Sequence, residues 1–152
     1  MKKIQIGKLL IAVLICEGVG ILGSFTTISS IQNWYQFLNK PPFNPPSWIF
    51  GPVWKFLYLL MGISLYMIWA RKGKHLTFFW IQLILNAIWS FLFFGLHSPT
   101  LALIDIVVLL IAIIITIKAF YKIYKLAGLI LLPYLVWVSF ATILNFYIWR
   151  LN

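Results

Sequence analysis

The sequence predicts an all-α integral membrane protein, a single domain over residues 1–152 built as a bundle of five transmembrane helices. Of the 152 residues, 63% are hydrophobic and only 9% are charged, whereas a soluble domain has about 45–50% apolar and about 25% charged residues. Short polar segments divide the chain into five apolar runs, each about as long as the roughly 20 residues that a spanning helix needs. All connections but one are tight, so we expect one antiparallel bundle.

The five spans are expected at residues 9–31, 51–70, 76–96, 101–121 and 127–149. The first run follows Lys2, Lys3 and Lys8 and therefore resembles a signal peptide. It is longer than the usual apolar region of 7–15 residues and carries Glu17, which favours a span that is retained. The fifth span is expected to be interrupted only at Pro133.

The basic residues orient the bundle. The chain carries 12 Lys and Arg against two acids, a net charge of +10. Since Lys and Arg are retained in the cytoplasm, a nine-to-three distribution predicts a cytoplasmic amino terminus and an external carboxyl terminus. The majority face would hold Lys2, Lys3, Lys8, Arg71, Lys72, Lys74, Lys118, Lys122 and Lys125, and the other face Lys40, Lys55 and Arg150. The excess of basic residues therefore indicates membrane lipid as a partner and argues against nucleic acid.

The sequence favours no metal and no tightly bound cofactor. Cys16 is the single cysteine, and His75 and His97 would lie on opposite membrane faces, too far apart to share a metal. The two acids, Glu17 and Asp105, are functional candidates by their position inside spans. They do not form a relay, however, and Asp105 is expected to reach the interface near the positive end of its helix.

The loop at residues 32–50, QNWYQFLNKPPFNPPSWIF, is the one long connection. Two proline pairs stiffen it, and its aromatic side chains, among them Trp34, Tyr35 and Trp48, make projection into water unfavourable. We expect it either to cover the bundle mouth as a lid or to anchor at the headgroup level as an aromatic belt. The residues of the loop leave the two alternatives equally open.

Aromatic and polar residues recur at helical spacing in three spans. A stripe of this kind is more often helix packing than a site, and a buried Asn is slightly more often an interhelical hydrogen bond than a ligand contact. Because several tryptophans converge on the outer half of the bundle, we nevertheless expect a cavity there for a large, flat, apolar ligand. Its candidates are Trp54 and Tyr58 in the second span, Asn86, Trp89 and Phe93 in the third, Trp137, Ala141 and Leu144 in the fifth, and Trp34 and Trp48 in the loop.

Small residues in the first span offer positions where helices can approach closely. They include Gly18, Gly20 and Gly23, and Gly20-x-x-x-Ser24 has the small-xxx-small spacing. This face could serve a homodimer, although the pattern supports a dimer only weakly.

Three segments of this chain carry a resemblance to a known family: WYQFLNKPPFNPPSWIFGPVWKFLYLLMGISLYMIW at 34–69, NAIWSFLFF at 86–94 and ATILNFYIWR at 141–150. They resemble the tryptophan-rich sensory protein/translocator protein family, also called the peripheral-type benzodiazepine receptor. The resemblance covers essentially the whole chain. It implies a five-helix bundle that binds tetrapyrroles, notably protoporphyrin IX, and in animal members cholesterol and benzodiazepine-type or isoquinoline-carboxamide ligands.

The resemblance also implies residue roles. Some bacterial members degrade protoporphyrin IX in light with pocket tryptophans, whose positions match Trp54 and Trp137, the candidate catalytic residues. Trp34, Tyr35 and Trp48 match the lid of the family, and Asn86, Phe93, Ala141 and Leu144 match pocket-lining positions. The carboxyl-terminal segment from Leu144 to Arg150 fits the weak cholesterol-recognition pattern, but we read Tyr147 and Arg150 chiefly as interfacial anchors.

Lys55, directly after GPVW, departs from the family pattern, because a small polar or apolar residue is expected there. Its ammonium group can extend outward to the interface or pair with a porphyrin propionate.

Two functions remain open from the sequence. One is a receptor for protoporphyrin IX and similar flat hydrophobic ligands in the bacterial cell membrane, with porphyrin degradation in light as an uncertain enzymatic activity. The alternative is a transporter that moves porphyrin or other hydrophobic molecules across the membrane. The odd number of spans and the lack of an inverted repeat disfavour transport.

Overall fold

The computed structural model describes residues 4–74 and 76–152. Lys2, Lys3 and His75, used above to orient the bundle and to exclude a shared metal, lie outside the described residues.

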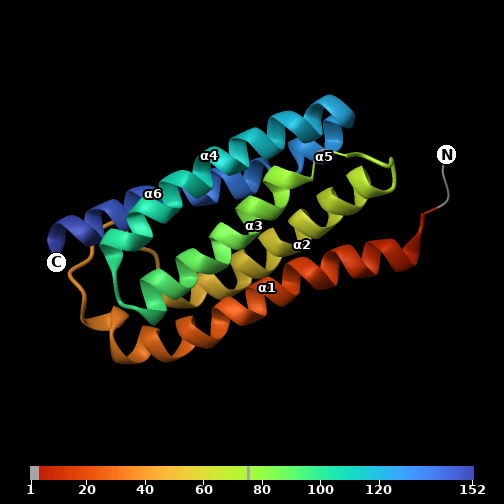
Figure 1. The fold of residues 1–152 in the computed structure, drawn as a ribbon. Helices are drawn as coiled ribbons and strands as arrows, with labels where there is room; N and C mark the ends of the chain where they lie inside the picture. The colour runs from red at the N-terminus through yellow and green to blue at the C-terminus, as the bar shows by residue number, and fades with distance from the viewer. Residues whose placement is uncertain (1–3, 75) are drawn as a thin grey trace.

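The described part of the chain is helical and contains no strand (Figure 1). Five helical segments are long and apolar enough to cross a membrane, which confirms the predicted all-α fold of five spans. The helices are α1 (Ile6–Asn33), α2 (Phe50–Trp69), α3 (Thr77–Ser90), α4 (Pro99–Ile123), α5 (Lys125–Leu129) and α6 (Leu132–Leu151). Single 3-10 turns at Tyr35–Phe37 and Ser47–Ile49 lie in the Pro-rich loop between α1 and α2.

Two spans depart from regular α-helix. The fifth is divided into α5 and α6 by a turn at residues 130–131, because Pro133 lies in the first turn of α6, where its missing N–H and its ring are tolerated. The third span ends in a π-helical turn, Phe91–Gly95, in which the Leu96 amide donates to the Phe91 carbonyl at 2.8 Å. Such wide turns are frequent at functional sites, and this one presents Phe93 and Phe94 to the bundle interior.

The connection from this turn to α4 is short. His97 adopts a left-handed backbone conformation with φ of 52°. Ser98 then caps α4 by accepting a hydrogen bond from the Leu101 amide at 3.3 Å, and Pro99 takes the first helical turn. The chain therefore reverses direction within a few residues and keeps α3 and α4 adjacent.

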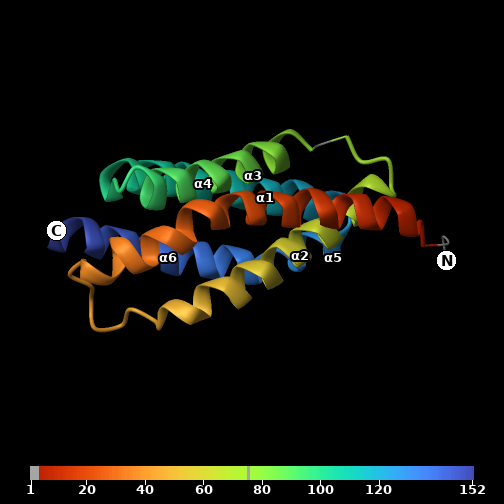
Figure 2. The same ribbon diagram turned by 90° about the horizontal axis from the view of Figure 1, so that it is seen from below.

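The spans close into a ring. α1 packs against α2 and α3, α4 packs against α3, α5 and α6, and α5 returns to α2 (Figures 1 and 2). The amino terminus, the α2–α3 loop and the α4–α5 connection lie at one end of the bundle, and the Pro-rich loop and the carboxyl terminus lie at the other. Most described basic residues thus share the amino-terminal end, which the positive-inside rule assigns to the cytoplasm.

Glycines hold α1 close to its neighbours inside the chain. A Cβ added at Gly20 would lie 2.6 Å from the Tyr58 ring, and one added at Gly23 would lie 3.2 Å from the Ser90 hydroxyl. Gly18 has nothing within 4 Å. The Gly20 face is therefore occupied by α2 and α3 of the same chain, so a homodimer through that face does not fit this packing. A homodimer through another surface stays a prediction.

Gly62→Ala is expected to destabilise the bundle. A Cβ at Gly62 would lie 2.6 Å from the Val13 Cα, and backbone cannot move aside as a flexible side chain can. Forcing the helices apart should lower the free energy of unfolding by about 1–3 kcal/mol. Thermal unfolding in detergent, followed by circular dichroism, measures this. Gly18→Ala is the matched control and should be neutral or stabilising; equal destabilisation by both substitutions would contradict the close packing.

Candidate functional site

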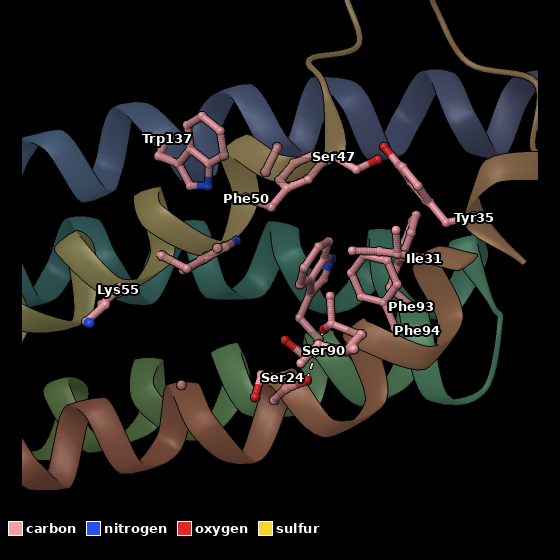
Figure 3. A pocket seen from close by; sticks show the side chains of 18 of the residues that line it. Ser24, Ile31, Tyr35, Ser47, Phe50, Lys55, Ser90, Phe93, Phe94 and Trp137 are labelled. Atoms are coloured by element: carbon pink, nitrogen blue, oxygen red, sulfur yellow. Dashed lines mark hydrogen bonds between the residues drawn. The ribbon is translucent and has the colours of Figure 1, made fainter. Parts of the chain in front are cut away.

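A cavity of about 560 Å³ lies in the half of the bundle next to the Pro-rich loop, and it is lined by α1, α2, α3, α6 and that loop (Figure 3). Its size falls within the roughly 300–1,000 Å³ of small-molecule sites, and its lining is mostly apolar and aromatic, as in such sites. The structure brings most predicted site residues together here: Tyr35, Trp48, Trp54, Tyr58, Trp89, Phe93, Trp137, Ala141 and Leu144 all line the cavity. Trp34 and Asn86 do not.

The second span forms one wall. Trp54 and Tyr58 lie one helical turn apart on the same face of α2, with ring centroids 5.7 Å apart. The Trp54 ring also lies 6.5 Å from Trp89 of α3 and 6.4 Å from Tyr134 of α6. Because Trp54 contacts aromatic rings on two other helices, its indole is held in place at the cavity wall.

The fifth span supplies a second wall through α6, which adjoins the wall on α2. Trp137 contacts Phe50 and Phe140, with ring centroids 6.1 and 5.6 Å away. Its indole Nε1 is buried and has no hydrogen-bond partner among the described residues, and Figure 3 shows this nitrogen on the edge of the ring turned toward the cavity. An unpaired buried N–H costs about 1–3 kcal/mol, so the protein carries an unsatisfied polar group beside the cavity. Ala141, one turn along, has a small side chain and leaves room for a ligand.

The third span completes the aromatic lining. Trp89 stacks on Phe93 with centroids 5.3 Å apart, and its Nε1 donates to Asn145 Oδ1 at 3.0 Å. Asn145 in turn donates to the Pro99 carbonyl at 2.9 Å. In contrast to the indole N–H of Trp137, that of Trp89 is already satisfied by the protein, so Trp89 offers a ligand its ring face alone.

The Pro-rich loop contacts both the cavity and the end of α6. Phe43 packs edge-on against Tyr147 at 5.3 Å, and the Asn39 amide donates to Asn152 Oδ1 at 3.0 Å. Tyr35 is buried, whereas Trp48 is 73% exposed at the rim. One aromatic residue of the loop therefore lies against the cavity and another is exposed at its rim. The lid and the aromatic belt both stay predictions.

Tyr35 is fixed as a neutral donor at the loop side of the cavity. Its hydroxyl donates to Asn44 Oδ1 at 2.7 Å, and the Lys40 ammonium lies 4.9 Å from its ring centroid. Burial raises the pKa of Tyr35 to about 12, against the opposing effect of the Asn44 hydrogen bond. The phenol therefore keeps its proton, and with it this loop contact, at physiological pH.

Trp34 lies behind the cavity lining. Its ring stacks on His97 with centroids 4.5 Å apart and meets Phe93 edge-on at 5.5 Å. His97 Nε2 also lies 3.2 Å from the Ser30 hydroxyl. Trp34 thus joins the start of the Pro-rich loop to the α3–α4 connection. It does not line the cavity, although the sequence makes it a candidate for the lining, and its family-based assignment to the lid stays a prediction.

Asn86 also lies one layer behind the cavity, in a buried chain of hydrogen bonds across three helices. Its Oδ1 accepts from the Tyr58 hydroxyl, its Nδ2 donates to the Tyr134 hydroxyl, and that hydroxyl donates to Gln82 Oε1, each at 2.7 Å. This is the interhelical role that the sequence slightly favoured. The network satisfies polar groups that would otherwise be unpaired in the membrane interior.

Tyr134→Phe is expected to destabilise the protein, because it removes two of these hydrogen bonds at once. Since single interhelical bonds contribute about 0.6 kcal/mol on average and up to about 1.7, the loss should be about 1–2 kcal/mol. Chemical unfolding in mixed micelles measures it. Tyr121→Phe is the control, since Tyr121 is 42% exposed on α4; an equal effect of the two substitutions would contradict the role of the network.

Sequence reasoning missed the first-span wall of the cavity. Gly20, Ser24 and Ile28 of α1 all line it. The Gly20-x-x-x-Ser24 spacing marked a close approach but could not show that the partner was α2 of the same chain. Asp105 also differs from its expected interfacial position, because it is 8% exposed in α4 and its Oδ2 has no hydrogen-bond partner among the described residues.

Comparison with known proteins agrees with this geometry. Residues 12–150 match the model of the TspO/MBR family. The chain is 46% identical to the tryptophan-rich protein TspO of Archaeoglobus fulgidus, over 95% of this chain and 97% of the relative. It is 44% identical to the protein of the same name from Chlorobaculum tepidum, over 97% and 98% of the two chains, and 39% identical to the human translocator protein, over 78% and 75%.

The matches to the two TspO proteins cover nearly the whole length of the chain, and the five apolar helices agree with an integral membrane location. The resemblance found in the sequence is therefore confirmed: this chain belongs to the TspO/MBR family of membrane proteins.

Proposed function

We propose that the chain is a membrane receptor for tetrapyrroles such as protoporphyrin IX and for similar flat hydrophobic ligands, and that it degrades the bound porphyrin in light and oxygen. The observation that carries the proposal is the cavity of about 560 Å³ with indole side chains on different helices. Family membership alone supports a membrane protein of this class and not a particular ligand.

The chemistry of the cavity lining suits a flat aromatic ligand. Trp54 and Trp137 line the cavity from α2 and α6, and Trp89 lines it from α3. Stacking on such rings is favourable beyond the area that it buries, by about 0.5–1.5 kcal/mol per pair. Because its Nε1 is buried, Trp137 offers the ligand its ring.

Porphyrin degradation in light needs an electron donor in the cavity, and we assign that role to its indoles. Indole is readily oxidised by one electron, so a photoexcited porphyrin against Trp54 or Trp137 would take an electron from it. The reduced porphyrin would pass that electron to dissolved oxygen, which becomes superoxide. An electron from the porphyrin then restores the indole, and the resulting porphyrin radical cation combines with superoxide, so that the porphyrin ring is oxidised and oxygen is reduced. The protein contributes the position of the indoles and the exclusion of water.

Titration with protoporphyrin IX tests the proposal. In the dark, we expect saturable quenching of tryptophan emission with one porphyrin per chain, and under illumination a loss of porphyrin absorbance faster than in empty micelles. Binding without faster bleaching would leave a receptor and remove the degradative activity. Absence of saturable quenching would contradict the proposed function as a whole.

A further inference from the structure

Two charged side chains stand out among the described residues that line the cavity: Glu17 of α1 and Lys55 of α2. The remaining lining residues are apolar or aromatic, or carry neutral hydroxyl or amide groups. A ligand that is flat and wholly apolar would not use either charge.

The two charges lie where α1 and α2 pack together. Close contacts of Gly20 with Tyr58 and of Gly62 with Val13 fix the antiparallel register of these helices. In that register Glu17 lies on α1 between the contact residues Val13 and Gly20. Lys55 lies on α2, about one turn before Tyr58. Figure 3 shows Lys55 at one end of the cavity, with its amine nitrogen on the side of α2 that faces α1.

This part of the cavity faces the bilayer. Ile21 and Ile28 both line the cavity, yet they are 58% and 65% exposed on the outer surface of α1. In a five-span bundle such surface is covered by lipid acyl chains. Lys55 is exposed and lies near the start of α2. An anionic group in the apolar part of the cavity is poorly solvated, and a cation from the protein stabilises it.

We propose that Lys55 binds a carboxylate of the ligand, so that the cavity selects a flat apolar acid over its neutral ester, and that Glu17 opposes this binding. This inference rests on the proposed function for the ligand class. Lys55 supplies a charge-assisted hydrogen bond to one carboxylate oxygen. Glu17 lines the same cavity and weakens the binding of an acid by like-charge repulsion.

The experiment compares protoporphyrin IX, which carries two carboxylates, with its dimethyl ester, which has the same ring and no acid. Both are titrated against the unmodified protein and Lys55→Met in detergent micelles, followed by tryptophan quenching. We expect Lys55→Met to weaken binding of the diacid by about tenfold or more, the range for a charged hydrogen bond, and to leave binding of the ester unchanged. The unchanged ester also shows that the variant is folded.

Two further variants sharpen the test. Lys118→Met removes the same charge from an exposed position of α4 away from the cavity, and it should change neither titration. Glu17→Gln should tighten binding of the diacid severalfold without changing that of the ester. An opposite sign for Glu17→Gln would contradict the opposing role assigned to it.

The outcomes separate this inference from the proposed function. Equal binding of diacid and ester, with no effect of Lys55→Met on either, would overturn the carboxylate site and leave the porphyrin receptor intact. Failure of both porphyrins to bind the unmodified protein would overturn the receptor function and the carboxylate site together.

Discussion

Replacing Trp54 and Trp137 together by phenylalanine is expected to sharply reduce light-dependent porphyrin degradation while keeping porphyrin binding. Both residues line the cavity from different helices, and phenylalanine keeps an apolar ring for stacking. The benzyl ring is far harder to oxidise than indole, so the excited porphyrin would lose the two donors assigned to it, while Trp48 and Trp89 stay in the lining. We expect bleaching of bound protoporphyrin IX to fall toward the rate in empty micelles, with the dissociation constant changed by less than about tenfold.

The matched control is Trp80→Phe with Trp149→Phe, which makes the same chemical change on α3 and α6 at positions that do not line the cavity. It should bleach porphyrin at the unmodified rate. Bleaching that continues unchanged in the Trp54 and Trp137 variant would remove these two residues from the catalytic role. If bleaching slows in the double variant, the two single variants show which residue is the donor. The candidates are Trp54, which is enclosed by rings, and Trp137, which has an unpaired N–H.

The architecture could be predicted from the sequence because the bilayer imposes it. A spanning segment needs about 20 apolar residues with all backbone hydrogen bonds internal, so span number follows from hydropathy alone. The predicted limits of the first span, 9–31, differ by only a few residues from the observed Ile6–Asn33. The break at residues 130–131 follows from Pro133, but the π-helical turn at Phe91–Gly95 has no such marker in the sequence.

The cavity walls on α2, α3 and α6 could be predicted in part, because aromatic residues at helical spacing identify one face of each helix. Spacing cannot show how deep a residue lies behind that face. Asn86 shares a face with Trp89, yet its amide is engaged by Tyr58 and Tyr134 and does not line the cavity. Trp34 likewise stacks on His97, a contact between segments more than 60 residues apart that no local pattern encodes.

The cavity wall on α1 is a second feature that residue spacing alone cannot predict. Small residues at positions 20 and 24 indicate that another helix approaches α1 closely. The sequence does not show whether that helix belongs to the same chain or to a second chain. The structure places the Tyr58 ring against Gly20, which makes α1 a wall of the cavity. Long-range packing, and not propensity, therefore decides where the ligand space lies.

Ala141→Phe is expected to remove ligand binding with little effect on the fold. Ala141 lines the cavity from α6, one turn from Trp137, and a benzyl group there would extend into the space that the ligand needs. Because the added ring fills a cavity and does not enter a close-packed core, stability should be unchanged or slightly raised. Displacement of a flat ligand by overpacking costs about 1–3 kcal/mol or more, so the dissociation constant for protoporphyrin IX should rise at least about tenfold.

Val136→Phe is the matched control, since Val136 lies on the same helix but is 69% exposed on its outer face. It adds a ring of the same kind toward the lipid and should leave the porphyrin titration unchanged. Thermal unfolding of both variants, measured beside the titrations, separates a filled cavity from a disrupted bundle. Full-strength binding by a stable Ala141→Phe protein would mean that the ligand does not use this cavity, because no flat tetrapyrrole could share the space with the new ring.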